Sequence, residues 1–218
     1  NYTLMGIPNW NSDIGGFFAG RWNREGGAKN PKYQELYVRW MQFGAFCPMM
    51  RSHGTEVPRE IWNFGKRGDW CFDAQEKIIN LRYRLLPYIY STSWDVSRHD
   101  GTFMRPLVMD FTLDKKTYGV GGEFLFGRSL LVAPVTRPEV TEWSVYLPQG
   151  ADWWDFWSNE KQSGGQTLNR SVSKDILPVY VKAGSILPFG PKVQYSTEKN
   201  WDNLEIRIYP GADGTFTL

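Results

Sequence analysis

The N-terminal half of the chain alternates short apolar runs with longer stretches of helical periodicity. Apolar runs at 4–7 and 45–50 each have the length of a buried strand, and polar side chains follow both. Between them, Asn30 and Pro31 supply a helix cap and a first helical residue, and Gly44 ends the helix. Strand, helix and strand in this order predict a βαβ unit with a parallel sheet. The apolar face of the helix comprises Tyr33, Leu36, Tyr37, Trp40 and Met41.

A second helix is predicted from Asp73, which starts a D-x-x-E capping pattern, to about Ser97. Pro87 lies inside this helix and should kink it, because proline cannot donate the backbone hydrogen bond of a helix interior. His99 follows in a polar exit and is predicted to be solvated. The segment 54–72 before this helix carries few strand or helix signals, and long loops in compact domains are usually functional.

From Arg105 onward the periodicity changes to short strand-like runs separated by glycine and proline. Short strands at this spacing predict an antiparallel β-sandwich, so the expected fold class is α/β followed by all-β. The change occurs between Met104 and Gly122, which places a domain boundary there. The predicted strands lie at 125–126, 130–133, 143–147, 153–157, 179–181, 186–187 and 204–208.

Composition and charge exclude several classes of protein. With 41% hydrophobic residues, the 218-residue chain can bury a core. Its net charge is +2, and its basic and acidic residues are interleaved. It lacks the Lys/Arg runs of a protein that binds nucleic acid or a membrane surface. No apolar run approaches the roughly 20 residues of a membrane span. Cys47 and Cys71 lack a C-x-x-C spacing, so they predict buried free thiols and neither a metal site nor a disulfide framework.

Asp13 is the first candidate binding residue. It is the only acidic residue among the first 23, it follows the first apolar run, and Gly15, Gly16 and Phe17 come shortly after it. A carboxylate accepts hydrogen bonds from sugar hydroxyls, and aromatic rings stack on the C–H faces of sugars. The alternative is that Asp13 only caps a turn or a helix, and the residues alone leave both interpretations open.

His53 and Arg51 follow the second apolar run. An imidazole at this strand end can hydrogen-bond a ligand hydroxyl, or it can be a core histidine satisfied by the backbone. Arg51 alternates to the opposite face of the strand, so it is predicted to be buried and to need a carboxylate partner. Asp13 is one candidate for that partner.

Catalytic residues are not marked by any spacing in the chain. Acid–base hydrolysis of a glycosidic bond needs two carboxyl groups about 5 to 10 Å apart. Asp13, Glu56, Glu60 and Asp69 are available, but no pair of them forms a catalytic motif. The chain also has no G-x-S-x-G, no H-E-x-x-H and no phosphate-binding glycine loop. From the residues alone, the reaction stays open.

A series of segments runs through the chain from its first part to its last. They are Gly6-Ile7-Pro8 with Ser12-Asp13-Ile14-Gly15-Gly16-Phe17, then 39–46, Met50-Arg51-Ser52-His53-Gly54, 81–90, 104–107 and 126–135. Taken together and in this order, these segments resemble glycoside hydrolase family 31, and the shared order makes the series highly specific.

The resemblance implies the C-terminal part of a retaining α-glycosidase, a family that consists mainly of α-glucosidases and α-xylosidases. Residues 1–106 would be the last two β/α units of a (β/α)8 barrel, and residues 107–218 the proximal β-sandwich. The family's two catalytic aspartates lie on earlier barrel strands, so no catalytic residue is expected in this chain. The loop 54–62 resembles that of bacterial members with α-xylosidase activity on xyloglucan fragments.

The site residues that the resemblance implies are substrate-binding ones. His53 matches the family's histidine that binds a substrate hydroxyl, and Asp13 matches the aspartate at the end of the seventh strand. Phe17 and Arg51 match its neighbours. The expected partners are an oligosaccharide substrate and the remainder of the chain's own barrel, and no cofactor, metal, nucleic acid or membrane is expected.

The alternative function is a carbohydrate-binding β-module without hydrolytic activity. In that case exposed Trp153, Trp154 and Trp157 would form a stacking platform for sugars. The competing interpretation places these tryptophans in the sandwich core, and we favour it because strand aromatics usually pack inward.

Overall fold

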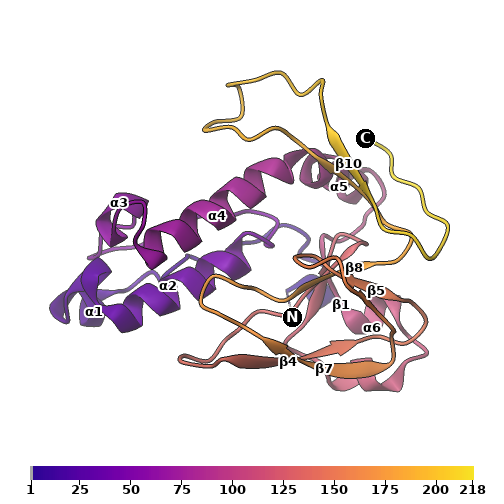
Figure 1. The fold of residues 1–218 in the computed structure, drawn as a ribbon, viewed down its shortest axis with the longest axis horizontal. Helices are drawn as coiled ribbons and strands as arrows, with labels where there is room; N and C mark the ends of the chain where they lie inside the picture. The colour runs from indigo at the N-terminus through magenta and orange to yellow at the C-terminus, as the bar shows by residue number, and fades with distance from the viewer. Residues whose placement is uncertain (1) are drawn as a thin grey trace.

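Helices occupy the N-terminal half of the chain and antiparallel strands the C-terminal half (Figure 1), in a computed structural model that describes residues 2–218. Helices α2 (Pro31–Gly44) and α4 (Trp70–Arg84) pack side by side. The other α-helices are α1 (Gly20–Arg24), α3 (Ile61–Phe64), α5 (Leu86–Arg98) and α6 (Leu107–Asp110), and 3-10 helices span Thr3–Met5, Gly27–Lys29 and Lys115–Gly119.

Helix α2 forms where its local signals predict it. The Asn30 side-chain oxygen accepts hydrogen bonds from the backbone N–H groups of Lys32 at 2.9 Å and Tyr33 at 3.2 Å. These two groups belong to the first turn of the helix, where backbone donors have no partner within the helix. Pro31 occupies the first helical position, and the helix ends at Gly44. The predicted cap, start and end are confirmed.

The predicted second helix is in fact two helices, α4 and α5. Helix α4 begins at Trp70, before the predicted start at Asp73, whose carboxylate accepts a hydrogen bond from the N–H of Gly68 at 3.0 Å. The helices are separated at Leu85, because Pro87 cannot donate to the carbonyl of Tyr83 and its ring would collide with that carbonyl. The expected kink is therefore a break.

The strands predicted at 4–7 and 45–50 are not formed. Part of the first run is the 3-10 helix Thr3–Met5, and the second run consists of turns and bends. Pro8 and Pro48 adjoin or interrupt these runs and cannot donate to a ladder. A pair of strands without further neighbours is also marginal, because it buries little apolar surface. The prediction of regular strands here is wrong.

The C-terminal strands assemble into three antiparallel sheets. The six-stranded sheet has the order β1-β2-β3-β8-β5-β6, and the pairs β4–β7 and β9–β10 form two-stranded sheets. Each predicted strand-like run contains a strand, whereas β1, β6 and β7 were not predicted. The strands are β1 (Met104–Pro106), β2 (Phe124–Phe126), β3 (Leu130–Val132), β4 (Glu142–Leu147), β5 (Trp153–Asp155), β6 (Lys161–Gln162), β7 (Gln166–Ser171), β8 (Val179–Lys182), β9 (Ile186–Phe189) and β10 (Glu205–Ile208).

One face of the six-stranded sheet packs on the β4–β7 pair. Leu125, Leu131 and Tyr180 from this sheet form a buried cluster with Val145 and Leu147 from β4. All five side chains are fully or almost fully buried. Two antiparallel sheets that share a core in this way are a β-sandwich, as the sequence predicts.

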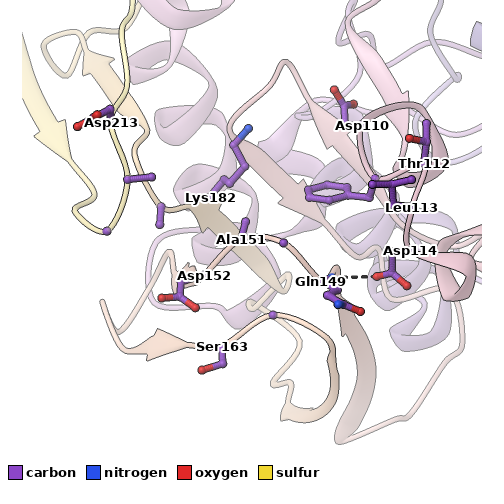
Figure 2. Close-up of a pocket in the computed structure, with 16 residues that line it drawn as sticks. Asp110, Thr112, Leu113, Asp114, Gln149, Ala151, Asp152, Ser163, Lys182 and Asp213 are labelled. Carbon is purple, nitrogen blue, oxygen red and sulfur yellow. Dashed lines mark hydrogen bonds between the residues drawn. The ribbon is translucent and has the colours of Figure 1, made fainter.

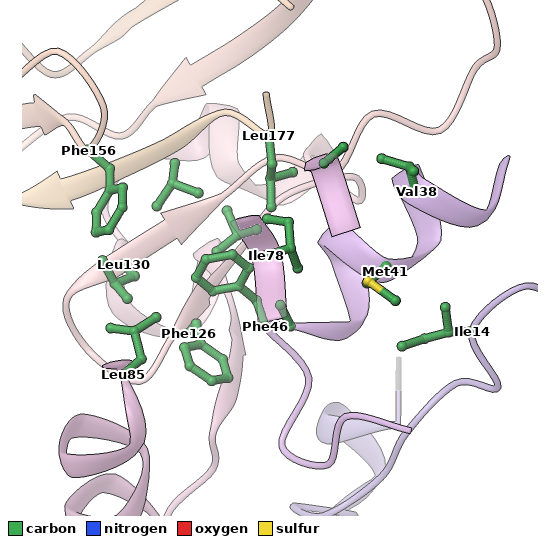
Figure 3. Close-up of a cluster of buried hydrophobic side chains, with 14 of the residues drawn as sticks. Ile14, Val38, Met41, Phe46, Ile78, Leu85, Phe126, Leu130, Phe156 and Leu177 are labelled. Carbon is green, nitrogen blue, oxygen red and sulfur yellow. The ribbon is translucent and has the colours of Figure 1, made fainter. Parts of the chain in front are cut away.

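The opposite face of the same sheet packs on the helices (Figure 3). Phe126, Leu130 and Val181 alternate with the residues of the sandwich core and cluster with Ile78 of α4 and Leu85 at the helix junction. The six-stranded sheet is therefore a central layer between the helices and the β4–β7 pair. This explains why β3 is buried at every position instead of alternating.

A separate fragment of residues 1–106 is expected to aggregate. It would keep Phe46, Ile78, Leu85 and Tyr88 but lose the sheet that covers them, and an exposed apolar face of this kind drives association. Size-exclusion chromatography with light scattering of the fragment and of the whole chain checks this. A soluble, monomeric fragment that unfolds cooperatively would contradict it. The boundary between residues 106 and 107 stays a prediction.

The tryptophans that could have formed a sugar-stacking platform belong to the fold. Trp153 is completely buried, and its indole N–H donates to the carbonyl of Pro148 at 3.1 Å. The indole N–H groups of Trp154 and Trp157 donate to backbone carbonyls of Pro210 and Leu177. The platform is thus contradicted, and the core interpretation is confirmed for Trp153.

Glu123, just before β2, makes the stability of the fold depend on pH. Its Oε1 accepts a hydrogen bond from the N–H of Tyr146 at 2.8 Å, and its buried Oε2 has no partner among the described residues. Burial raises the pKa of this carboxyl from 4.5 to about 7. Between these values the unfolded chain binds fewer protons than the folded chain, so the free energy of unfolding falls as the pH rises.

Replacing Glu123 by the neutral isostere is expected to remove most of this pH dependence. At pH 8, Glu123→Gln should be more stable than the unmodified chain by about 2 kcal/mol, and at pH 4 the two should differ little. Urea unfolding at both pH values measures the difference. Glu142→Gln, which changes an exposed carboxylate on β4, is the control. An equal effect of Glu123→Gln at both pH values would contradict the assignment.

Candidate functional site

Two loop segments, residues 10–17 and 49–55, run side by side in the same direction. Backbone hydrogen bonds join Met49 N–H to the carbonyl of Trp10, Ile14 N–H to that of Arg51, and Thr55 N–H to that of Phe17. The paired residue numbers rise together along both segments, so the course is parallel. The parallel arrangement that the sequence predicts is therefore present, although without regular strands.

The turn after Asp13 brings its side chain and the following aromatics to the second segment. Gly16 N–H donates to the Asp13 carbonyl at 2.8 Å, and Gly15 and Gly16 both have left-handed backbone conformations. A Cβ on Gly15 would lie 2.6 Å from the ring of Tyr37. Glycine is thus needed here both for its conformation and for the close approach of the helix.

Asp13 is paired with Arg51. The Arg51 Nη2 donates to Asp13 Oδ1 at 2.9 Å. The carboxylate side chain is 23% exposed and the guanidinium side chain 49% exposed. The pairing is the one that the sequence suggested, whereas the predicted burial of Arg51 is wrong, because no regular strand holds it against a core. An exposed pair of this kind adds at most about 1 kcal/mol to stability.

His53 lies against Phe17. The two ring centroids are 5.3 Å apart, with 60° between the ring planes, and both residues are exposed. Phe17 also makes an edge contact with Phe18 at 4.8 Å. An exposed imidazole beside an aromatic ring offers a hydrogen-bonding group and an apolar face to the same ligand. His53 is therefore not a core histidine satisfied by the backbone.

We define the loop cluster as Asp13, Phe17, Arg51 and His53, which the two parallel segments carry as an Asp13–Arg51 ion pair and a Phe17–His53 ring contact. The cluster can accept and donate hydrogen bonds and can stack on a ring. The other candidate acids of the loop are bound locally: Glu56 Oε2 accepts from the N–H of Ala19 at 2.7 Å, Glu60 from Asn63, and Asp69 from the N–H of Lys66. These three carboxylates are therefore engaged in hydrogen bonds within the loops.

Sequence reasoning missed two residues that build this part of the molecule. Glu56 has a left-handed backbone, with φ of 74°, and its side chain holds the start of α1. Arg59 donates hydrogen bonds to carbonyls of both loop segments. No local motif marks either residue, because the contacts that join the segments go to backbone atoms far away in the sequence.

The two cysteines are unsuited to nucleophilic catalysis. Both are free and buried, as predicted. Burial raises the pKa of the Cys47 thiol to about 12 and that of Cys71 to about 11, so both remain protonated at neutral pH.

None of the helices in residues 2–218 has the length and the apolar composition of a membrane span.

A cavity of about 920 Å³ lies in the C-terminal half of the chain, and no residue of the loop cluster lines it (Figure 2). Its carboxylates mainly serve the fold. Asp114 accepts hydrogen bonds from the hydroxyl of Tyr146 at 2.6 Å and the N–H of Gln149 at 2.8 Å. Asp110 is paired with Arg105. The lining comes from residues 110–114, 149–152, 163–164, 182–183 and 211–213.

Comparisons with known proteins identify close relatives along the whole chain. An α-xylosidase from Saccharolobus solfataricus is 43% identical over 221 residues, which cover 100% of this chain and 29% of that protein. Alpha-glucosidase 2 from Bacillus thermoamyloliquefaciens is 34% identical over 219 residues, which cover 100% of this chain and 26% of that protein. The crystal structure of a family 31 α-xylosidase from Xanthomonas citri matches with a TM-score of 0.94 and 42% identity, over 99% of this chain and 24% of the other.

The chain thus spans about a quarter of the length of these proteins. Its two halves match two consecutive domain descriptions. Residues 1–92 match the glycosyl hydrolases family 31 TIM-barrel domain, and residues 100–187 match the glycosyl hydrolase family 31 C-terminal domain. The chain therefore belongs to glycoside hydrolase family 31, in which it joins the end of the TIM-barrel domain to the C-terminal domain.

Proposed function

We propose that this chain is part of a retaining α-glycosidase that hydrolyses terminal α-linked xylose or glucose from oligosaccharides. The chain supplies one side of the sugar subsite, and the remainder of the barrel supplies the two catalytic aspartates. The observation that carries the proposal is the loop cluster on two parallel segments, because active sites of β/α barrels are built from the loops that follow parallel strands. Relatives named α-xylosidase and α-glucosidase support the class of substrate.

Each residue of the cluster has a distinct task in this proposal. His53 hydrogen-bonds a hydroxyl of the bound sugar. Phe17 packs against His53 and faces the apolar side of the ring. Asp13 accepts a second hydroxyl and is held in place by its ion pair with Arg51. None of these groups forms or breaks the glycosidic bond.

The isolated 218-residue chain is expected to hydrolyse neither aryl α-xylosides nor aryl α-glucosides. A retaining glycosidase needs a nucleophilic carboxylate and a second carboxylic acid that protonates the leaving oxygen. Binding groups alone lower a barrier only when the reacting groups are present. Release of the chromophoric phenol, compared with the full-length parent protein, measures this. Hydrolysis by the isolated chain that is abolished in Asp13→Asn would overturn the proposal and make Asp13 itself catalytic.

A further inference from the structure

Arg59 joins the two loop segments that carry the loop cluster, which we call the Asp13 loop and the His53 loop. Its Nη2 donates to the carbonyl of Gly16 at 2.5 Å and to that of Phe17 at 3.4 Å. Its Nη1 donates to the carbonyls of Thr55 at 3.1 Å and Val57 at 2.8 Å. One planar guanidinium group therefore holds backbone atoms of the Asp13 loop and of the His53 loop at the same time.

The carbonyl of Phe17 is where these contacts meet. It accepts the N–H of Thr55 at 2.8 Å, the hydroxyl of Thr55 at 3.4 Å and the Nη2 of Arg59 at 3.4 Å. Such contacts fix the backbone that carries the Phe17 ring, and this ring lies against His53. The position of both binding side chains therefore depends on donors from residues 55 and 59.

Arg59 is itself anchored to the helical layer. The hydroxyl of Tyr37 donates to the carbonyl of Arg59 at 3.0 Å and lies 2.7 Å from the hydroxyl oxygen of Ser52, the residue before His53. Tyr37 is completely buried in α2 and stacks on Phe64, with 4.2 Å between ring centroids. Helix α2 thus fixes the positions of the Arg59 backbone and of the segment that carries His53.

The contacts of Arg59 are made by its fork geometry and not by an ion pair. Among residues 2–218, no carboxylate lies within ion-pairing distance of its guanidinium group. Gly54 passes so close that a Cβ there would collide with Arg59 Nη2 and with the Phe17 carbonyl. Glycine at position 54 therefore leaves the space that the guanidinium group occupies. A lysine has one ammonium group and lacks the two-pronged geometry that contacts both segments.

We propose that Arg59 is a positioning residue for the sugar subsite: it locks the Asp13 loop to the His53 loop and so holds Phe17 and His53 in their binding geometry. The inference rests on the proposed function, because it assigns Arg59 to the same subsite. Arg59 acts through backbone carbonyls and does not touch the sugar.

The test uses Arg59→Lys in the full-length parent protein, because the lysine keeps the charge and loses the fork. We expect KM, and the Ki of the free sugar that the enzyme releases, to rise about 5- to 10-fold, since the binding side chains lose their fixed positions. A smaller folded fraction would lower kcat alone and would leave both constants unchanged. Arg67→Lys is the matched control, because Arg67 is exposed in the same loop and pairs with Glu76.

Hydrogen exchange of the Thr55 amide reports whether Arg59 locks the two loops, independently of sugar binding, because this amide donates to the Phe17 carbonyl. Faster exchange in Arg59→Lys, together with the higher Ki, supports the proposal. Unchanged exchange shows that Arg59 does not lock the loops and overturns it. Faster exchange with an unchanged Ki shows that the loops are locked but do not bind the sugar, which overturns this inference through the proposed function.

Discussion

His53→Ala in the full-length parent protein is expected to lower kcat/KM by roughly 100-fold, which is what the loss of a charged or buried hydrogen bond to the transition state costs. In the proposed function the exposed imidazole beside Phe17 contacts a sugar hydroxyl, and alanine removes that contact without disturbing a core. Initial rates on an aryl α-xyloside and an aryl α-glucoside measure the loss.

The chain contains its own control for this experiment, since it has 2 histidines. His99 is exposed at the end of α5 and contacts Asp95, away from the parallel segments. His99→Ala should leave kcat/KM within about two-fold, as expected for a surface substitution away from the site. Equal rates for His53→Ala and the unmodified enzyme would remove His53 from the subsite.

Phe126→Ala is expected to destabilise the 218-residue chain by about 3–5 kcal/mol, because it leaves a cavity in a packed core. Phe126 is fully buried in β2, and its ring lies 4.4 Å from that of Phe103 and 5.4 Å from that of Phe46. The hydroxyl of Tyr88 in α5 also donates to its carbonyl at 2.9 Å. Urea unfolding, followed by circular dichroism and by tryptophan fluorescence, measures the change.

Phe126 lies between the helices and the six-stranded sheet, so both layers should unfold in one transition (Figure 3). Phe18→Ala is the control, because this ring is 84% exposed and its loss should change stability by less than about 0.5 kcal/mol. Two separate transitions, with only one of them shifted by Phe126→Ala, would contradict the shared core.

Elements with local signals could be predicted from the sequence. Helix α2 is specified by Asn30 and Pro31 at its start, and both act within a single turn. Strands β2, β3, β5 and β8 of the central sheet are short apolar runs between turn residues, and the sequence predicts them, whereas it does not mark the edge strands β1 and β6. Strand β7 was missed, because it lies in a two-stranded sheet and carries polar residues at most positions, with exposed and half-buried side chains in alternation.

Elements whose form depends on distant neighbours could not be predicted. The runs at 4–7 and 45–50 have the composition of buried strands but lack a sheet around them in this chain, so they fold as turns and a 3-10 helix. Arg51 was predicted to be buried by strand alternation and is exposed for the same reason. Its pairing with Asp13 is formed, although the prediction derives a partner from the need of a buried charge and Arg51 is exposed.

The binding residues and their supporting residues differ in how far a sequence can reveal them. Asp13 and His53 stand out because each comes after an apolar run and is followed within two residues by glycine. Arg59 and Glu56 act on backbone atoms of another segment, and a backbone atom leaves no mark in the sequence. Such residues become visible only when the fold brings the segments together.

The structure of the full-length parent protein with bound xylose or glucose tests the central claim most directly. The account predicts a ring nitrogen of His53 within about 3.2 Å of a sugar hydroxyl, with Asp13 and Phe17 against the same sugar and the reacting carboxylates contributed by residues outside this chain. A sugar bound elsewhere, with His53 and Asp13 facing only solvent, would contradict the account.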